Sequence, residues 1–103
     1  MGYRVKKWQK DFVPDATELK SQMESEGFSV FEWSDLPGRT YGPHKHGENQ
    51  SHWIVSGILE LTIENYGKVT LRTGDRDFMP ANTMHSAQVI GDEPVIYLIG
   101  AKR

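Results

Sequence analysis

Hydrophobic and polar residues alternate along most of the chain after residue 28, which is the pattern of half-buried β-strands. In the stretch ILELTIE, the residues Leu59, Leu61 and Ile63 fall on one face, and glutamates and a threonine fall on the other. Similar short runs recur between turn-forming glycines, prolines and asparagines. Seven or eight short strands in about seventy-five residues predict a sandwich or a barrel.

The strand that precedes Gly57 has the opposite parity. There Gln50, His52 and Ile54 share one face, while Trp53 lies on the other. If even positions point inward before Gly57 and odd positions point inward after it, the register shifts by one residue at this glycine. Glycine is the residue expected where a strand kinks or bulges.

Trp53 and Val55 would then lie on the outer face of their sheet and need cover. We expect this cover from the N-terminal segment or from a second subunit. The segment 3–12 is a candidate for strand exchange or edge pairing in a homodimer. The sequence therefore predicts a homodimer as one arrangement of the chain.

One α-helix is predicted ahead of the strands, over about residues 16–26. Asp15 or Thr17 can cap its N-terminus, and Gly27 is suited to follow its C-terminus. Its apolar positions form only a narrow stripe, made of Ala16, Leu19 and Met23. We expect a surface helix that packs on the outside of the β-structure.

Composition narrows the possible functions. A chain of 103 residues predicts one domain. The balance of 12 basic and 14 acidic residues lacks the basic excess of a nucleic-acid-binding protein, so no nucleic-acid partner is expected. Without cysteine, a metal must be held by imidazole, amide or carboxylate groups. No apolar run has the length of a membrane span or a signal peptide, so we expect a cytoplasmic protein without a membrane partner.

The histidines are the candidate chemistry of the chain. Three of the four fall within nine residues, in the stretch HKHGENQSH, and the fourth is His85. If this region is extended, His44 and His46 share one face, and Arg39 and Tyr41 face away from them. A lone histidine in a β-protein is more often structural than a ligand. Three imidazoles that converge in an interior, however, usually have a divalent cation as their partner.

These histidines stand in a pattern that resembles the first motif of the cupins, especially the small single-domain bacterial ones. That motif reads G(x)5HxH(x)3–4E(x)6G. In this chain His44 and His46 match the paired histidines and Gly57 matches the closing glycine. Gln50 stands at the position of the glutamate.

The second cupin motif, G(x)5PxG(x)2H(x)3N, resembles the stretch GDRDFMPANTMHSAQV. Gly74, Pro80 and His85 fall at the spacing of the motif. Asn82 replaces a glycine and Val89 replaces the final asparagine. Asparagine tolerates a positive φ better than other non-glycine residues, so the first replacement is mild.

The resemblance implies an all-β fold, namely a small double-stranded β-helix (jelly-roll) barrel over residues 28–103. An N-terminal strand or arm and the surface helix would occupy residues 1–27. It also implies one divalent metal, held by His44, His46 and His85 with Gln50 in the fourth place.

Because these four side chains are neutral, they leave the charge of a metal uncompensated. They should favour Zn, Ni, Fe or Cu over harder ions, and should attract anionic ligands. His52 lies on the same face as Gln50. It could be a fourth imidazole ligand, a base beside the metal, or a cavity-lining residue.

Two functions stay open from the sequence. The first is a metal-dependent enzyme, of oxygenase or isomerase type, that acts on a small polar or anionic molecule in the barrel cavity. The alternative is a non-catalytic small-ligand-binding or sensory module, which cupin domains also form. No nucleophile–base pair, phosphate loop or pair of carboxylates decides whether the chain is an enzyme. In both cases the expected partner is a small-molecule ligand.

Overall fold

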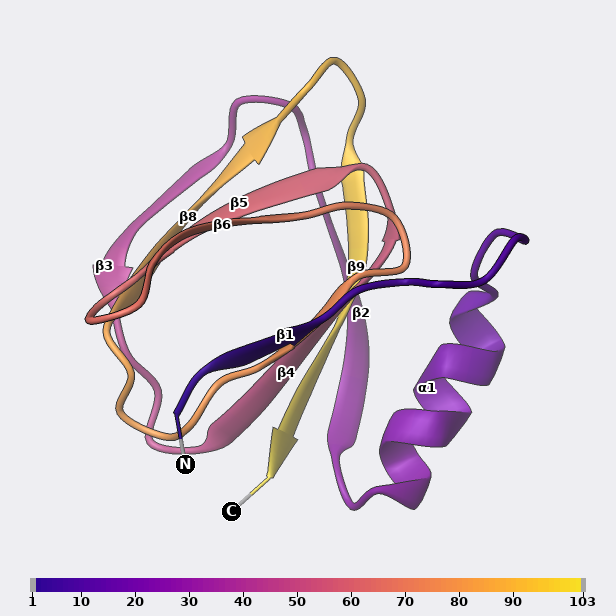
Figure 1. Cartoon of the computed structure of the whole chain (residues 1–103), viewed down its shortest axis with the longest axis horizontal. Coiled ribbons are helices and arrows are strands. Elements are labelled where there is room, and N and C mark those ends of the chain that lie inside the picture. The colour runs from indigo at the N-terminus through magenta and orange to yellow at the C-terminus, as the bar shows by residue number, and fades with distance from the viewer. Residues whose placement is uncertain (1, 103) are drawn as a thin grey trace.

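The computed structural model describes residues 2–102, which form two antiparallel β-sheets that face each other and one helix outside them (Figure 1). The five-stranded sheet has the order β1 (Arg4–Lys6), β7 (Arg76–Phe78), β4 (Asn49–Ser56), β9 (Val95–Lys102) and β2 (Ser29–Asp35). The four-stranded sheet has the order β3 (Thr40–His44), β8 (His85–Ile90), β5 (Ile58–Ile63) and β6 (Gly67–Leu71). The predicted all-β jelly-roll barrel is confirmed.

The change of parity at Gly57 is confirmed. Ile54 is fully buried in the core between the sheets, together with Leu59 and Leu61 from the following strand. The pairing of β4 with β9 shifts register between Ile54 and Ser56, and Gly57 has φ +88°. At this glycine the chain leaves the five-stranded sheet and enters the four-stranded one. A one-residue bulge thus keeps the apolar face inward across the corner.

The predicted helix is present as α1 (Ala16–Ser25). Asp15 is its N-cap, because its carboxylate accepts hydrogen bonds from the backbone N–H groups of Thr17 and Glu18. Gly27 follows the helix with φ +100°, as a C-terminal glycine does. Among residues 2–102, no helix is long and apolar enough to cross a membrane.

The cover of Trp53 comes from within the chain. Leu19 and Met23 of α1 are buried in one apolar cluster with Trp53, and Trp8 packs against the same cluster. The indole N–H of Trp53 donates to the carbonyl of Gly74 at 2.9 Å. Of the two sources of cover expected from the sequence, the N-terminal segment is the one observed.

The N-terminal strand β1 pairs with β7 of the same chain, and its register places Val5 opposite Asp77. It therefore lies at one edge of the five-stranded sheet, and β2 lies at the other edge. Since Trp53 is covered without a second subunit, the homodimer is not required by this packing and stays a prediction.

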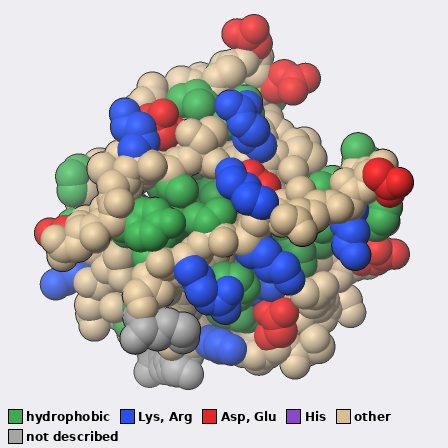
Figure 2. All heavy atoms as spheres, in the orientation of Figure 1, with side chains coloured by type: hydrophobic (Ala, Val, Ile, Leu, Met, Phe, Trp, Pro, Cys, Tyr) green, Lys and Arg blue, Asp and Glu red, His purple; other side chains and the backbone are tan. Residues whose placement is uncertain are grey.

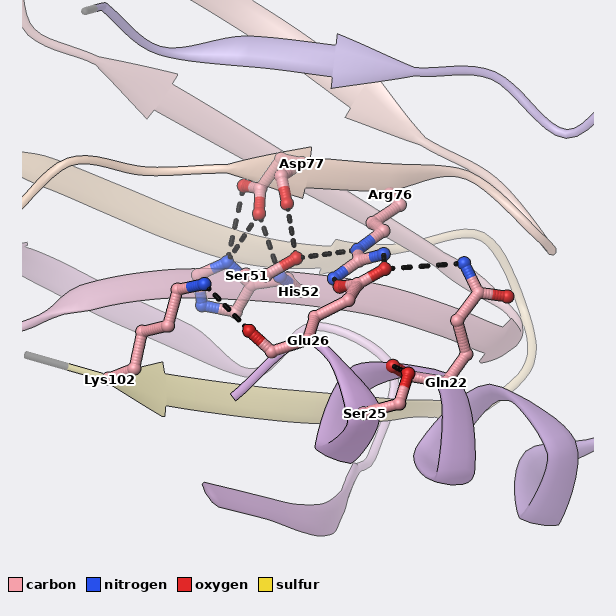
Figure 3. Close-up of polar contacts among 8 residues, drawn as sticks. All are labelled: Gln22, Ser25, Glu26, Ser51, His52, Arg76, Asp77 and Lys102. Atoms are coloured by element: carbon pink, nitrogen blue, oxygen red, sulfur yellow. Dashed lines mark hydrogen bonds and ion pairs between the residues drawn. The ribbon is translucent and has the colours of Figure 1, made fainter. Parts of the chain in front are cut away.

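A buried arginine holds α1 against the sheet. The Arg76 guanidinium donates to both carboxylate oxygens of Glu26, at the end of the helix, with the shorter distance 2.6 Å (Figure 3). Its Nε–H donates to the hydroxyl of Ser51 on β4 at 2.8 Å. The aromatic rings of Trp53 and Phe78 pack against the guanidinium, and their centroids lie 4.4 and 4.3 Å from Cζ of Arg76. The charge is buried but fully partnered.

Candidate metal centre

The structure brings three of the four histidines together. One ring nitrogen from each of His44, His46 and His85 can be chosen so that the three lie within 4.8 Å of one another. The ring centroids are 4.3 Å apart for His44 and His85, and 4.9 Å apart for His44 and His46. His44 ends β3 and faces His85, which begins β8, in the strand register. His46 lies two residues beyond the end of β3, so His44 is the last residue of the strand and His46 belongs to the loop that follows it.

Backbone carbonyls fix the tautomers of two of these rings. Nδ1 of His44 lies 2.6 Å from the carbonyl oxygen of Gly42, and Nδ1 of His85 lies 2.8 Å from that of Thr83. A carbonyl oxygen only accepts, so Nδ1–H is the donor in each ring. Nε2 then carries the lone pair that a metal requires, and the carbonyls hold the rings in orientation.

The cluster favours neutral imidazoles. Burial lowers the pKa of His46, and the neighbouring His44 and His52 lower it further. Burial also lowers the pKa of His85, only partly offset by its hydrogen bond to Thr83. Both rings are therefore unprotonated near neutral pH, which is the form that binds a metal.

Gln50 provides an unpartnered acceptor beside the histidines. Its backbone is fixed by two hydrogen bonds with Met79, of 2.7 and 2.8 Å. The side chain is only 9% exposed and lines the same cavity as the histidines, yet Oε1 has no hydrogen-bond partner among the described residues. A buried acceptor without a partner is costly. Three imidazoles and one amide oxygen form a donor set that fits a divalent transition metal.

His52 is held apart from this group by a carboxylate. Its Nδ1–H donates to Oδ1 of Asp77 at 2.9 Å, and both side chains are buried (Figure 3). Burial alone would lower the pKa of His52, but the charge and hydrogen bond of Asp77 outweigh it, so the pKa is raised. Its ring centroid is 6.5 Å from that of His85, and it lies outside the group of three. His52 lines the cavity, and Asp77 holds its ring in place.

Asp77 is the site residue that the sequence analysis missed. It is fully buried, and it also accepts hydrogen bonds from the backbone N–H of His52 and the hydroxyl of Tyr3, at 2.7 and 2.8 Å. The available signal was weak: Asp77 stands inside the short run RDFMP, which reads as a strand, and an aspartate is rarely buried there without partners.

The barrel cavity has a volume of about 250 Å³ and joins the histidine cluster to an aromatic wall. Tyr41 is part of that wall, so the expectation that it faces away from the site is wrong. The pairing of β3 with β8 is irregular between Tyr41 and His44, which breaks the strict alternation of the strand. The Arg39 guanidinium lies over the Tyr41 ring, 4.8 Å from its centroid, and Arg39 is not among the residues that line the cavity. No histidine is visible on the face drawn in Figure 2.

Comparisons with known proteins agree with this geometry. The profile of a family described as "Cupin domain" matches residues 31–99, which contain β3 to β8 and most of β2 and β9. No curated protein sequence is significantly similar to the chain.

Solved structures share the fold. A crystal structure from a study of the DMSP lyases RdDddP and RnDddQII is 26% identical, with a TM-score of 0.69, over 76% of this chain and 40% of that one. KdgF from Halomonas sp. is 29% identical, with a TM-score of 0.60, over 74% and 71% of the two chains. A DUF861 family protein from Thermotoga maritima, at 18% identity and a TM-score of 0.63, matches 97% of this chain and 99% of its own length. The chain thus spans less than half of the lyase structure.

Proposed function

This chain belongs to the cupin family, and from that premise we propose that it is a metal-dependent enzyme acting on a small anionic molecule in the barrel cavity. One observation carries the proposal: Gln50, whose buried Oε1 has no hydrogen-bond partner among the described residues, lines the same cavity as the converging His44, His46 and His85. We take the metal to be one of Zn, Ni, Fe or Cu, because imidazoles dominate the donor set.

The residues have separate roles in this proposal. His44, His46 and His85 would hold the metal, and Gln50 would be a fourth ligand or would orient a water. When bound, a divalent metal supplies Lewis acidity to an oxygen atom of the ligand or of water.

His52 would contact the ligand from the side of the cavity. Because Nδ1 is occupied by Asp77, Nε2 is the ring atom left for a hydrogen bond to the ligand, and in the protonated ring that the raised pKa of His52 favours, Nε2–H would donate to an anionic group. Asp77 thereby orients the ring without contacting the ligand itself.

The named relatives support an enzymatic activity. The DMSP lyases are enzymes by name, and their similarity covers most of this chain. This chain spans only 40% of that structure, so the proposal takes from the lyases the enzymatic character and not their substrate. The reaction that we propose is of the oxygenase or isomerase type.

The alternative function is a non-catalytic ligand-binding or sensory module. One observation favours it: His52, the cavity histidine outside the cluster, is tied to a buried carboxylate, and most of the remaining wall is apolar. A binding module of this kind would recognise the same small ligand without converting it.

Metal analysis of protein purified without added metal tests the proposal first. We expect about one transition-metal ion per chain. Oxygen consumption and product formation with small acids, ketones and thiols then separate the enzyme from the binding module. If metal-stripped protein shows no calorimetric binding of Zn²⁺, Ni²⁺, Cu²⁺ or Fe²⁺ near neutral pH, the metal-dependent function is rejected.

We also propose that the chain forms a homodimer. The support is that β1 and β2 are edge strands, which can extend a sheet into a second copy. Light scattering at micromolar concentrations tests it, and a monomer mass would reject the dimer.

A further inference from the structure

The mouth of the cavity is aromatic. Phe31 and Trp33 of β2 line it although they are 50% and 44% exposed, and their rings meet edge to face with centroids 6.2 Å apart. Tyr97 of β9 is the direct strand partner of Trp33 and lines the same cavity. Large aromatic side chains exposed at the entrance of a cavity are typical of a ligand-binding surface.

A carboxylate holds part of this wall in place. Asp35 accepts a hydrogen bond from the Tyr41 hydroxyl at 2.9 Å and another from the Trp33 indole N–H at 3.1 Å. Trp33 belongs to β2 and Tyr41 to β3, which are edge strands of different sheets. The contact therefore bridges the open side of the barrel and fixes both rings before any ligand binds, which lowers the entropic cost of binding.

Few polar atoms of the cavity remain for a ligand. The Tyr97 hydroxyl has no hydrogen-bond partner among the described residues, although the side chain is only 5% exposed. Burial, and then the charge of Asp35, raise the pKa of Tyr97, so this hydroxyl stays a donor. With Gln50 and His52 it makes three polar positions outside the cluster of three histidines. The Tyr41 hydroxyl is already bonded to Asp35, and the other lining residues, such as Leu59 and Leu61, are mostly apolar.

This inventory disfavours a heavily hydroxylated ligand. Each hydroxyl that enters an apolar wall without a partner costs free energy, and three positions cannot pair the many donors and acceptors of a sugar acid. The volume of about 250 Å³ lies below the roughly 300–1,000 Å³ of sites for drug-sized ligands. The ligand is therefore small, and its body contacts rings and aliphatic side chains.

We propose that this cavity binds a small monoanionic acid with an apolar, ring-shaped body. Its anionic end lies at the cluster of His44, His46 and His85, and its body lies against Phe31 and Trp33. The position of the anionic end rests on the proposed metal function, whereas the apolar preference rests on the aromatic wall alone.

Isothermal titration of the Zn²⁺-loaded protein tests the proposal with matched acids. Acetate and phenylacetate have the same carboxylate and differ by one ring, glucuronate has a hydroxylated body, and glycine betaine has a cationic one. We expect phenylacetate to bind at least about tenfold more tightly than the other three, a difference of about 1.4 kcal/mol. Equal affinities would overturn the proposal, and tightest binding of glucuronate or glycine betaine would also overturn it.

Variants locate the effect. Trp33→Ala should remove most of the advantage of phenylacetate and leave acetate binding unchanged, and Phe31→Ala should act in the same direction. Phe12→Ala is the matched control, because Phe12 is exposed and contacts Trp8 outside the cavity. An unchanged preference in both cavity variants would overturn the proposal.

The two proposals can fail separately. Titration with Zn²⁺ alone tests the metal function before any acid is added. If Zn²⁺ does not bind, phenylacetate is titrated into metal-free wild type and metal-free Trp33→Ala. Weaker binding by the variant would keep the apolar wall as the ligand-binding surface, and identical or absent binding in both would overturn it.

Discussion

His52 and Asp77 form a buried histidine–carboxylate pair, with 2.9 Å between Nδ1 and Oδ1. The carboxylate also accepts from the Tyr3 hydroxyl, so one buried group ties β4, β7 and the segment ahead of β1 together. Asp77 acts on the site through His52, and it lies outside the three-histidine group. Replacement of Asp77 should therefore lower the stability of the fold but leave metal binding intact.

Asp77→Asn should lower the free energy of unfolding by about 3–5 kcal/mol, because it removes the charge from a buried pair and sets amide hydrogens against existing donors. Denaturation with urea measures this loss. Asp92→Asn is the control, since it makes the same chemical change at an exposed position. Zn²⁺ should still bind at wild-type stoichiometry in folded Asp77→Asn. A loss below about 1 kcal/mol would contradict the structural role assigned to the pair.

Gln50→Glu should strengthen metal binding and shift the preference toward Mn²⁺, because a carboxylate adds a hard anionic ligand. We expect a gain of about tenfold in affinity, or about 1.4 kcal/mol. Calorimetry on metal-stripped protein measures it, with Gln88→Glu as the control for the same charge change at an exposed residue of β8. Equal gains in both variants would assign the effect to overall charge.

Single alanine substitutions show how much each side chain contributes to metal binding. His46→Ala or His85→Ala should abolish stoichiometric metal binding, and Gln50→Ala should only weaken it, because a neutral amide is the weaker ligand. His52→Ala should retain the metal and alter binding of the organic ligand. Loss of metal from His52→Ala would instead make His52 a ligand.

Gly57→Ala should be strongly destabilising. A Cβ there would lie 2.6 Å from the carbonyl oxygen of Pro94, and the backbone has φ +88°. Gly38→Ala is the control, because Gly38 has φ +86° and no atom within 4 Å of the added Cβ. The control should lose about 1–2 kcal/mol of unfolding free energy, and Gly57→Ala should lose clearly more. Equal losses would show that the strand corner relaxes easily.

The ion pair between Glu26 and Arg76 should make stability depend on acid pH (Figure 3). The hydrogen bond from Arg76 lowers the pKa of Glu26, against a smaller opposing effect of burial. Because the pKa of Glu26 is lower in the folded state, its ionised carboxylate stabilises the fold at pH values above the unfolded pKa of about 4.3. This stabilisation is lost as the pH falls through the pKa of the folded state.

The stability advantage of wild type over Glu26→Gln should therefore be constant between about pH 7 and 5 and shrink below about pH 4. Urea midpoints across this range measure it. Glu24→Gln on the same helix is the control, and it should show no such trend. A difference that is independent of pH would mean that the charge of Glu26 does not stabilise the fold.

Local patterns in the sequence determined the elements and the outline of the site. The period of two identified the inward faces on either side of Gly57, and Asp15 and Gly27 marked the ends of the helix, because strand alternation and helix capping involve residues that are close in sequence. The spacing of His44, His46 and His85 likewise carried the resemblance to cupins.

Only the tertiary structure decided the partners across strands. Asp77 is 25 residues from His52, and nothing in the spacing of the two predicts that β7 lies beside β4. Tyr41 faces the cavity because β3 is irregular where it pairs with β8, and Trp53 is covered because α1 packs on its face of the sheet. Such contacts depend on the order and register of distant strands, which local periodicity does not encode.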